Sequence, residues 1–336
     1  MTAAAAPAPA VPCPRRGTAP LAGDRFCEVC GADLRATPAA AVEEGCPGCG
    51  HLLAPDGDGW CPVCGTRLPD GTEHVEIALD GDGAAGSDRG HVRSRNEDAV
   101  ALGRGSGRVA AVVCDGVSST RSSELAARAA ADAALDVLLG PSGADPVGRA
   151  SAERCTRGAV AAAAAAAGAL VPRGTPSPPS CTLVSGVHEV SSGVLTVGWV
   201  GDSRAYWLAE PGAAEPARLL TDDHTAEAAA EAGTLDPAVA AVRPDAITRW
   251  LGADGDAEPD VVTFTPAGPG ALLLCSDGLW KYLPGAAELA AVALPALALG
   301  GPQAAVAALA AAALTAGGAD NVTVAVLPVH PPQEEQ

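Results

Sequence analysis

The sequence has few aromatic residues and few basic ones, and each shortage narrows what the protein can be. Aromatic residues make up 3% of the 336-residue chain, whereas hydrophobic residues, many of them alanine, reach 48%. This predicts an ample core of small side chains in more than one folded unit. Basic residues number 21 against 40 acidic ones, a formal net charge of −19. Nucleic acids and anionic membranes bind clustered Lys and Arg, so we expect neither as a partner.

The chain also lacks a secretory signal and an uninterrupted apolar span. Residues 1–14 hold Ala and Pro, but no basic segment followed by a leucine-rich stretch. The most apolar region, residues 289–314, is divided by Pro295 and by a Gly-Gly-Pro break at 300–302 into pieces too short to cross a bilayer. We therefore expect two alanine-rich helices there, no membrane association and a cytoplasmic location.

Cysteines are plentiful only near the N-terminus. The chain has 11 cysteines, and six of them form Cys-x-x-Cys pairs, each followed by glycine, before residue 66. Without secretion, paired cysteines favour metal binding over disulfides. The pairs Cys46/Cys49 and Cys61/Cys64 predict a tetrahedral four-thiolate zinc site. Redox dithiols are the weaker interpretation, because those use a single pair that opens a helix.

The first Cys-x-x-Cys pair has no complete second pair to share a metal with. Cys27 and Cys30 would face Cys13, but Arg16 stands where a fourth thiolate is expected. Either three thiolates hold zinc with a borrowed ligand, or this first site is empty. The segment resembles the double zinc ribbons appended to many bacterial proteins. That resemblance implies one or two Zn²⁺ ions and a protein partner for the ribbons, since four thiolates leave the site negative.

The order of these features predicts the organisation of the chain. We expect turns over residues 80–90, where Gly and Asp alternate. The expected segments are a tail (1–12), a double zinc ribbon (13–68), a linker with the first strand (69–90), a large domain (75–328) and a second tail (329–336).

The large domain alternates apolar runs with alanine-rich stretches. A helix is expected to start at Ser122 or Ser123 and to end at the Gly-Pro pair 140–141. A second helix is expected over 152–170, followed by a loop over 171–180. Four short apolar runs predict strands at 109–114, 194–200, 271–275 and 322–327.

Carboxylates recur at the ends of these predicted strands. Asp115, Asp202 and Asp277 follow apolar runs, Asp320 precedes one, and Glu97 and Asp98 are adjacent. A single Asp-Gly at a strand end is usually only a turn. Several such ends can meet at one rim of packed sheets, where carboxylates repel one another unless divalent cations neutralise them. Oxygen ligands favour Mg²⁺ or Mn²⁺ over zinc.

Six motifs occur in a family-specific order: GHVRSRNEDAV, VVCDGVSST, GDSRAY, LTDDHT, CSDGLW and GADNVTV. Over roughly residues 75–327 the chain resembles the metal-dependent, type 2C serine/threonine protein phosphatases. The resemblance implies an α+β fold, in which two packed antiparallel β-sheets are flanked by helices (an α-β-β-α sandwich). It also implies two Mn²⁺ or Mg²⁺ ions at one end of the sandwich.

The resemblance assigns roles to individual residues. Asp115 would bridge both metals, and Arg93 would grip the substrate phosphate with its planar fork. Asp202 and Asn321 would support the ligands. The implied metal set is Glu97, Asp98, Asp115, Gly116 through its carbonyl, Asp277 and Asp320.

These parts imply hydrolysis of phosphoserine and phosphothreonine in proteins, and a role in signalling. A water activated by the two ions would attack phosphorus, and Arg93 would help to offset the charge of the transition state. No covalent intermediate is needed, so Cys114 and Cys275 are expected to be buried strand residues. The zinc ribbons would recruit a partner or restrain the catalytic domain.

Two departures from the family pattern keep an alternative open. Lys281 stands where many members carry an aspartate for a third metal, so we expect no third site and a solvated lysine. Val117 replaces a histidine that eukaryotic members often use as a general acid, a role that water can take. The alternative is a catalytically silent, phosphatase-like scaffold that acts through its zinc ribbons. His224 is expected to be structural or to line the substrate site rather than to bind a metal.

Overall fold

The computed structural model divides the chain into two compact units, Met1–Asp70 and Gly71–Gln336. The residues that it describes are 46, 49–51, 61–65, 71–140, 148–210 and 212–330. The two predicted tails (but for residues 329–330) and Cys13, Cys27 and Cys30 lie outside these ranges.

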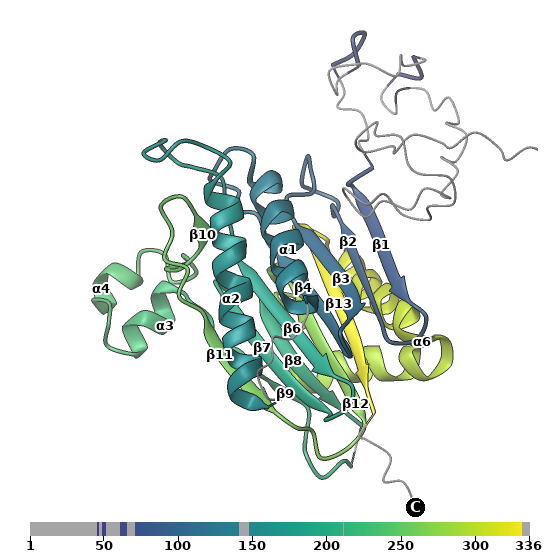
Figure 1. Cartoon of the computed structure of the whole chain (residues 1–336). Coiled ribbons are helices and arrows are strands. Elements are labelled where there is room, and N and C mark those ends of the chain that lie inside the picture. Colours follow the sequence, from purple (N-terminus) through teal and green to yellow (C-terminus); the bar gives the residue numbers. More distant parts are fainter. Residues whose placement is uncertain are drawn as a thin grey trace, which may run out of the picture. The chain divides into compact units, whose positions relative to one another are not determined.

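Two antiparallel sheets packed face to face form the centre of the second unit (Figure 1). The six-stranded sheet has the order β1 (His74–Leu79), β2 (Gly83–Asp88), β13 (Val322–Val329), β12 (Gly270–Cys275), β8 (Arg204–Ala209), β9 (Arg218–Leu219). The five-stranded sheet has the order β11 (Asp260–Phe264), β7 (Val194–Val200), β6 (Leu183–Glu189), β4 (Arg108–Cys114), β3 (Ala99–Gly105). A short pair joins β10 (Leu251–Gly252) to β5 (Ser180–Cys181).

Helices cover the outer face of each sheet. α1 (Ser123–Leu139) and α2 (Arg149–Gly168) pack on the five-stranded sheet, and α6 (Ala286–Ala316) packs on the six-stranded one (Figure 1). The remaining helices are short: α3 (Ala226–Glu231), α4 (Pro237–Ala240) and α5 (Asp277–Trp280). The predicted α-β-β-α sandwich is therefore confirmed.

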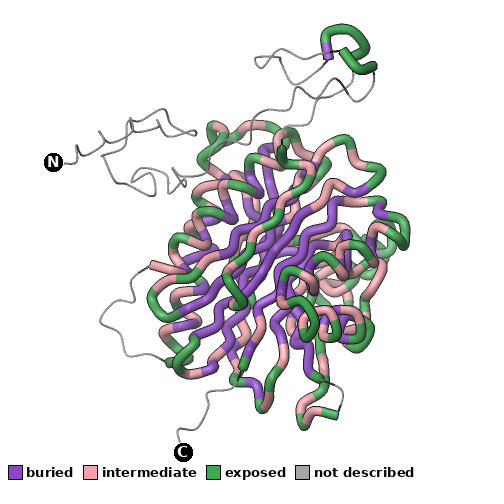
Figure 2. Tube along the Cα trace, turned by 90° about the vertical axis from the view of Figure 1, so that its right-hand side faces the viewer, coloured by how far each residue is buried: buried purple, intermediate pink, exposed green. Residues whose placement is uncertain are grey.

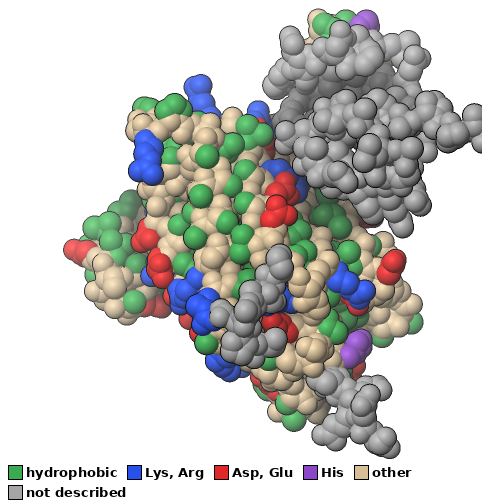
Figure 3. Space-filling view, viewed as in Figure 1, with side chains coloured by type: hydrophobic (Ala, Val, Ile, Leu, Met, Phe, Trp, Pro, Cys, Tyr) green, Lys and Arg blue, Asp and Glu red, His purple; other side chains and the backbone are tan. Residues whose placement is uncertain are grey.

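Three apolar layers hold the sandwich together, and buried residues concentrate in its strands (Figure 2). Between the sheets lie the larger side chains, including Trp207 and Leu272, both almost completely buried. Under α1 and α2 the layer is mainly alanine, as the composition predicts, with Ala130 and Ala163 fully buried. Small side chains let these helices lie close to the sheet. The middle of this outer face carries few charged side chains (Figure 3).

The four predicted strands match β4, β7, β12 and β13 to within two residues. The predicted helices correspond to α1 and α2, and α1 ends before Gly140 as expected. Ser122 takes the N-cap position, but with a positive φ of 58° and without a side-chain cap bond. Ser123 instead donates its hydroxyl to Glu97 Oε1 at 2.9 Å. The first residue of this helix therefore hydrogen-bonds to one of the predicted acidic residues, and no side chain caps the helix.

The turns predicted around residues 80–90 occur at residues 80–82 and 90, but between them lies β2, which the prediction missed. This interior strand pairs with β1 and β13. Its sequence, GAAGSD, has no hydrophobic alternation by which to recognise it. The small residues are needed for close packing. A Cβ on Gly86 would lie 2.9 Å from Val306 Cγ1 of α6, and one on Gly83 would lie 2.7 Å from Leu327 Cδ2.

Helix α6 contains the most apolar stretch of the sequence. Within the described part of the chain, it is the one helix long and apolar enough to cross a membrane. However, Leu289, Ala293 and Leu309 are fully buried against the six-stranded sheet. The predicted break is present, because Gly300 and Gly301 leave helical geometry. The region therefore forms two helical pieces that pack with one face on the six-stranded sheet.

Candidate active site

The predicted acidic residues come from strand ends in both sheets. Asp115 follows β4 and Asp98 precedes β3 in the five-stranded sheet, whereas Asp277 follows β12 and Asp320 precedes β13 in the six-stranded one. Burial raises the pKa of Asp115 well above its usual range, and the negative charges of Asp98, Asp277, Asp202 and Asp320 raise it further. The structure thus brings these carboxylates together around Asp115.

Asp98 lies deepest in this acidic cluster. It is 8% exposed, and burial raises its pKa to about 7, although the Thr323 and Ser276 hydroxyls act in the opposite direction. Its Oδ2 atom is buried and has no hydrogen-bond partner in the described part of the chain. A buried carboxylate oxygen without a partner is costly unless a cation satisfies it. The cluster is therefore suited to a cation bound by oxygen ligands.

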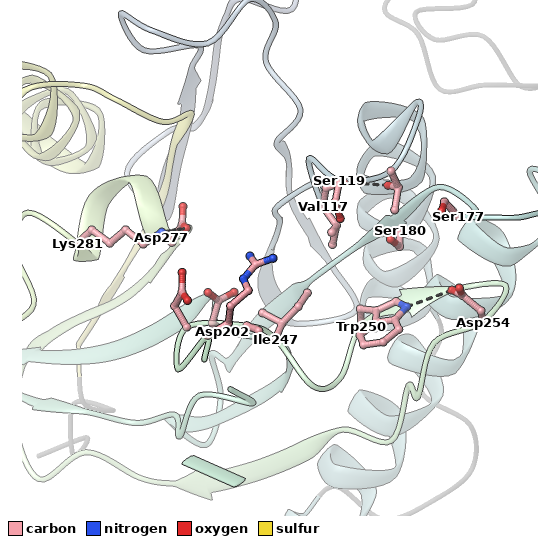
Figure 4. Close-up of a pocket in the computed structure, with 14 residues that line it drawn as sticks. Val117, Ser119, Ser177, Ser180, Asp202, Ile247, Trp250, Asp254, Asp277 and Lys281 are labelled. Atoms are coloured by element: carbon pink, nitrogen blue, oxygen red, sulfur yellow. Dashed lines mark hydrogen bonds and ion pairs between the residues drawn. The ribbon is translucent and has the colours of Figure 1, made fainter. Parts of the chain in front are cut away.

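Two carboxylates of the cluster are paired with basic side chains. Arg93 contacts Asp320 Oδ2 at 2.6 Å and donates to Ser118 Oγ at 2.9 Å. Lys281 Nζ forms an ion pair with Asp277 Oδ2 (Figure 4). The described residues contain no group of three carboxylates whose oxygens all lie within 4.8 Å of one another. In this structure, Asp320 and Asp277 are therefore each paired with a basic group.

Asn321 ties the strand ends of the cluster to one another. Its Oδ1 accepts from the Glu97 N–H at 2.8 Å, and its Nδ2 donates to the carbonyls of Arg89 and Arg95 at 2.8 and 2.9 Å. Gly116 is required by close packing, because a Cβ there would lie 2.5 Å from the Glu97 carbonyl. Both residues fix where Glu97 lies.

Asp202 is a further buried carboxylate near Asp277. Burial, with the charges of Asp277 and Asp223, raises the pKa of Asp202 to about 7, while Lys281 lowers it. The Asp202 carbonyl accepts from Trp280 Nε1 at 2.9 Å. Loop 201–202 is thereby attached to the short helix that begins at Asp277.

Comparison with known proteins decides the family. The model of the protein phosphatase 2C family matches residues 85–313, more than half of the chain. The chain belongs to the protein phosphatase 2C family. It is thus a protein serine/threonine phosphatase, an enzyme class that acts on phosphoproteins. No curated protein sequence matches it.

Solved bacterial phosphatases share the fold. A bacterial serine phosphatase superposes with a TM-score of 0.60 at 23% identity, covering 75% of this chain and 99% of its own. The serine/threonine phosphatase PstP/Ppp of Mycobacterium tuberculosis gives 0.54 at 28% identity, covering 74% and 98%. Stp1 of Staphylococcus aureus gives 0.59 at 23% identity, covering 76% and 98%.

Lys281 of this phosphatase is exposed, as expected, but its ammonium also has a partner that we did not expect. Its side chain is 48% exposed, yet its ammonium is held by Asp277, whose side chain is 14% exposed. Burial lowers the pKa of Lys281, but Asp277, Asp202 and Asp320 outweigh that effect and raise it. Lys281 is also the only lysine in the sequence, since the other basic residues are all arginine. This cation is therefore a component of the site.

Sequence reasoning missed a second cation near the phosphatase site. Arg204 binds Asp223 with two hydrogen bonds of 2.9 and 2.7 Å, and its guanidinium lies 3.7 Å from the Trp280 ring centroid. Arg204 lies within the motif GDSRAY and Asp223 within LTDDHT, but nothing in the two motifs shows that these residues pair with each other. Arg204 positions the helix that begins at Asp277.

His224 behaves as a structural residue. Its Nδ1 accepts from the Gly201 N–H at 3.1 Å, and its Nε2 lies 2.9 Å from Asp260 Oδ2. Burial lowers the pKa of His224, so the neutral ring is favoured. The residue therefore fixes the loop that leads to Asp202.

The first unit contains the predicted four-cysteine cluster. The sulfurs of Cys46, Cys49, Cys61 and Cys64 all lie within 4.8 Å of one another. Gly50 and Gly65 close the two turns with positive φ angles of 72° and 69°, which glycine adopts without strain. Four converging thiolates are the donor set and number of a structural zinc site.

Proposed function

We propose that this phosphatase hydrolyses phosphoserine and phosphothreonine in proteins by means of water activated by two Mn²⁺ or Mg²⁺ ions. The observation that carries the proposal is the set of carboxylates around Asp115, with the unpartnered Oδ2 of Asp98 inside it. The catalytic domain of a serine/threonine protein phosphatase PstP, 28% identical to this chain, was solved in complex with 2 manganese ions. When bound, such ions supply a nucleophilic water near neutral pH.

The residues that would hold the ions offer oxygen ligands only. Asp115 is central, and Asp98, Asp277, Asp320 and Glu97 surround it. Hard oxygen donors of this kind suit Mg²⁺ and Mn²⁺. The Gly116 carbonyl is a further ligand in this proposal. Each carboxylate would then be attracted to a cation, and this attraction would offset the repulsion among the neighbouring carboxylates.

Arg93 would receive the substrate phosphate. Its side chain is 34% exposed, so it lies at the mouth of the cluster rather than below it. Asp320 and Ser118 hold its guanidinium. A guanidinium can offer two parallel N–H groups to phosphate oxygens and offset charge that develops there. Asp202 and Asn321 would keep the surrounding loops in place.

For the first unit, we propose one zinc ion bound by Cys46, Cys49, Cys61 and Cys64. The convergence of four sulfurs supports this assignment. The ion would join the two cysteine turns to each other. The unit would then bind a protein partner or regulate the phosphatase domain.

The test is hydrolysis of a phosphothreonine peptide by the zinc-loaded full chain with and without Mn²⁺. We expect Mn²⁺-dependent release of phosphate, and a loss of at least about 100-fold in Asp115→Asn. Circular dichroism confirms that the variant is folded. A wild-type protein that stays inactive with Mn²⁺ and Mg²⁺ would instead support the silent scaffold.

A further inference from the structure

A cavity of about 520 Å³ adjoins the acidic cluster, and most of the residues that line it have no role in the proposed reaction. Asp202, Asp277 and Lys281 line one side of it, while Trp250 and Asp254 lie at the other (Figure 4). Ligand pockets typically have volumes of about 300–1,000 Å³, so this cavity has room for more than a phosphate group. Its continuity with the acidic cluster makes the rest of a bound substrate its natural occupant.

Part of the cavity wall is apolar. Val117, Ile247 and Trp250 are each half-buried and form this part, and the polar residues beside them include Ser119, Ser177, Ser180, Arg243 and Asp245. The indole N–H of Trp250 donates to Asp254 Oδ1 at 3.1 Å, which satisfies the one polar atom of that ring. The remaining ring surface can only make apolar or stacking contacts. Covering it with an apolar side chain is favourable.

The wall that carries Trp250 is attached to the acidic cluster. Leu251 of β10, next to Trp250, pairs with Cys181 of β5. Cys181 also forms a bridge with Gly116, the residue after Asp115. The strand framework therefore fixes how far the Trp250 ring lies from the central carboxylate.

The second wall is anchored near Asp202. Ile247 forms a bridge with Thr225, the residue after His224. The His224 ring in turn accepts from the Gly201 N–H, next to Asp202. Both apolar walls are thus held before any ligand arrives, which reduces the entropy cost of binding.

We propose that this cavity is a subsite for an apolar side chain next to the phosphorylated residue of a substrate protein. The inference rests on the proposed function, which places the phosphate at the acidic cluster. An extended peptide advances about 3.3–3.6 Å per residue, so a side chain one or two positions away reaches the adjoining cavity. The phosphatase therefore selects substrates partly by this side chain.

The test compares phosphothreonine peptides that differ only in leucine or alanine at the positions flanking the phosphothreonine. We expect wild-type kcat/KM to favour leucine by about tenfold, mostly through KM. Trp250→Ala should bring that ratio close to one, whereas Trp250→Phe, which keeps an aromatic ring, should retain most of it. Val242→Ala is the matched control, because Val242 lies on the same segment, is 79% exposed and does not line the cavity.

A wild-type ratio near one, or a ratio that Trp250→Ala leaves unchanged, overturns the subsite. Affinities of Asp115→Asn for the two peptides, measured by fluorescence anisotropy, separate the subsite from the reaction. Tenfold tighter binding of the leucine peptide together with inactive wild type contradicts the proposed function and supports the subsite. If circular dichroism shows that Trp250→Ala is unfolded, Ile247→Ala carries the same prediction.

Discussion

Removing the charge of Lys281 should strengthen the binding of Mn²⁺. The ammonium pairs with Asp277, so a divalent cation that binds this carboxylate must displace it or lie beside it. A pair this exposed contributes about 0.2–1 kcal/mol. Repulsion between an ammonium and a divalent ion about 4 Å apart adds about 2 kcal/mol in water, and less when salt screens it. Salt that halves this repulsion leaves a combined cost of about 1.2–2 kcal/mol, so Mn²⁺ should bind at least roughly tenfold more tightly to Lys281→Met.

Isothermal titration calorimetry of Mn²⁺ into the zinc-loaded full chain measures this directly. Lys281→Arg keeps the charge and should bind Mn²⁺ like wild type. Arg157→Met is the control for net charge, because Arg157 is 49% exposed and pairs with Glu258, outside the acidic cluster. The reasoning is refuted if Lys281→Met binds Mn²⁺ no more tightly than Arg157→Met.

Three further predictions concern stability and zinc. Because the folded-state pKa of Asp98 is raised to about 7, the folded metal-free protein holds a proton that the unfolded chain releases above about pH 4. Its melting temperature should therefore rise as pH falls from 8 to 5, and Asp98→Asn should flatten that rise; an unchanged profile would contradict the burial argument. Gly278→Ala should cost more than about 3 kcal/mol in urea unfolding, because its Cβ would lie 1.9 Å from the Asn321 carbonyl oxygen; a loss below 1 kcal/mol would show that the loop yields easily. Cys46→Ser should abolish release of one zinc ion per chain in a chromogenic chelator assay, and a zinc content equal to that of wild type would place the metal elsewhere.

The acidic cluster could be predicted because its signal is local. Each of Asp115, Asp277 and Asp320 adjoins an apolar strand, and the sandwich brings strand ends from both sheets together. The fold could be predicted because the order of the six motifs resembles that of a family with a known fold. Strand β2 could not be predicted, because GAAGSD owes its place to neighbours far along the chain, such as Val306 and Leu327.

Two features of the site were missed for different reasons. Lys281 was expected to be solvated, although Asp277 lies four residues earlier, a spacing at which opposite charges on a helix can pair. Trp250 carried no motif at all. Its role depends on the β10–β5 pair, two residues long, which propensity and periodicity do not detect.

The central claim is that the carboxylates around Asp115 hold two divalent cations. The most direct measurement is a crystal structure of the full chain grown with Mn²⁺, with anomalous scattering recorded at the manganese edge. The account predicts two manganese peaks within ligand distance of the Asp115 carboxylate, with Lys281 displaced from Asp277. Peaks that lie away from Asp115, or a map with none in the acidic cluster, would contradict it.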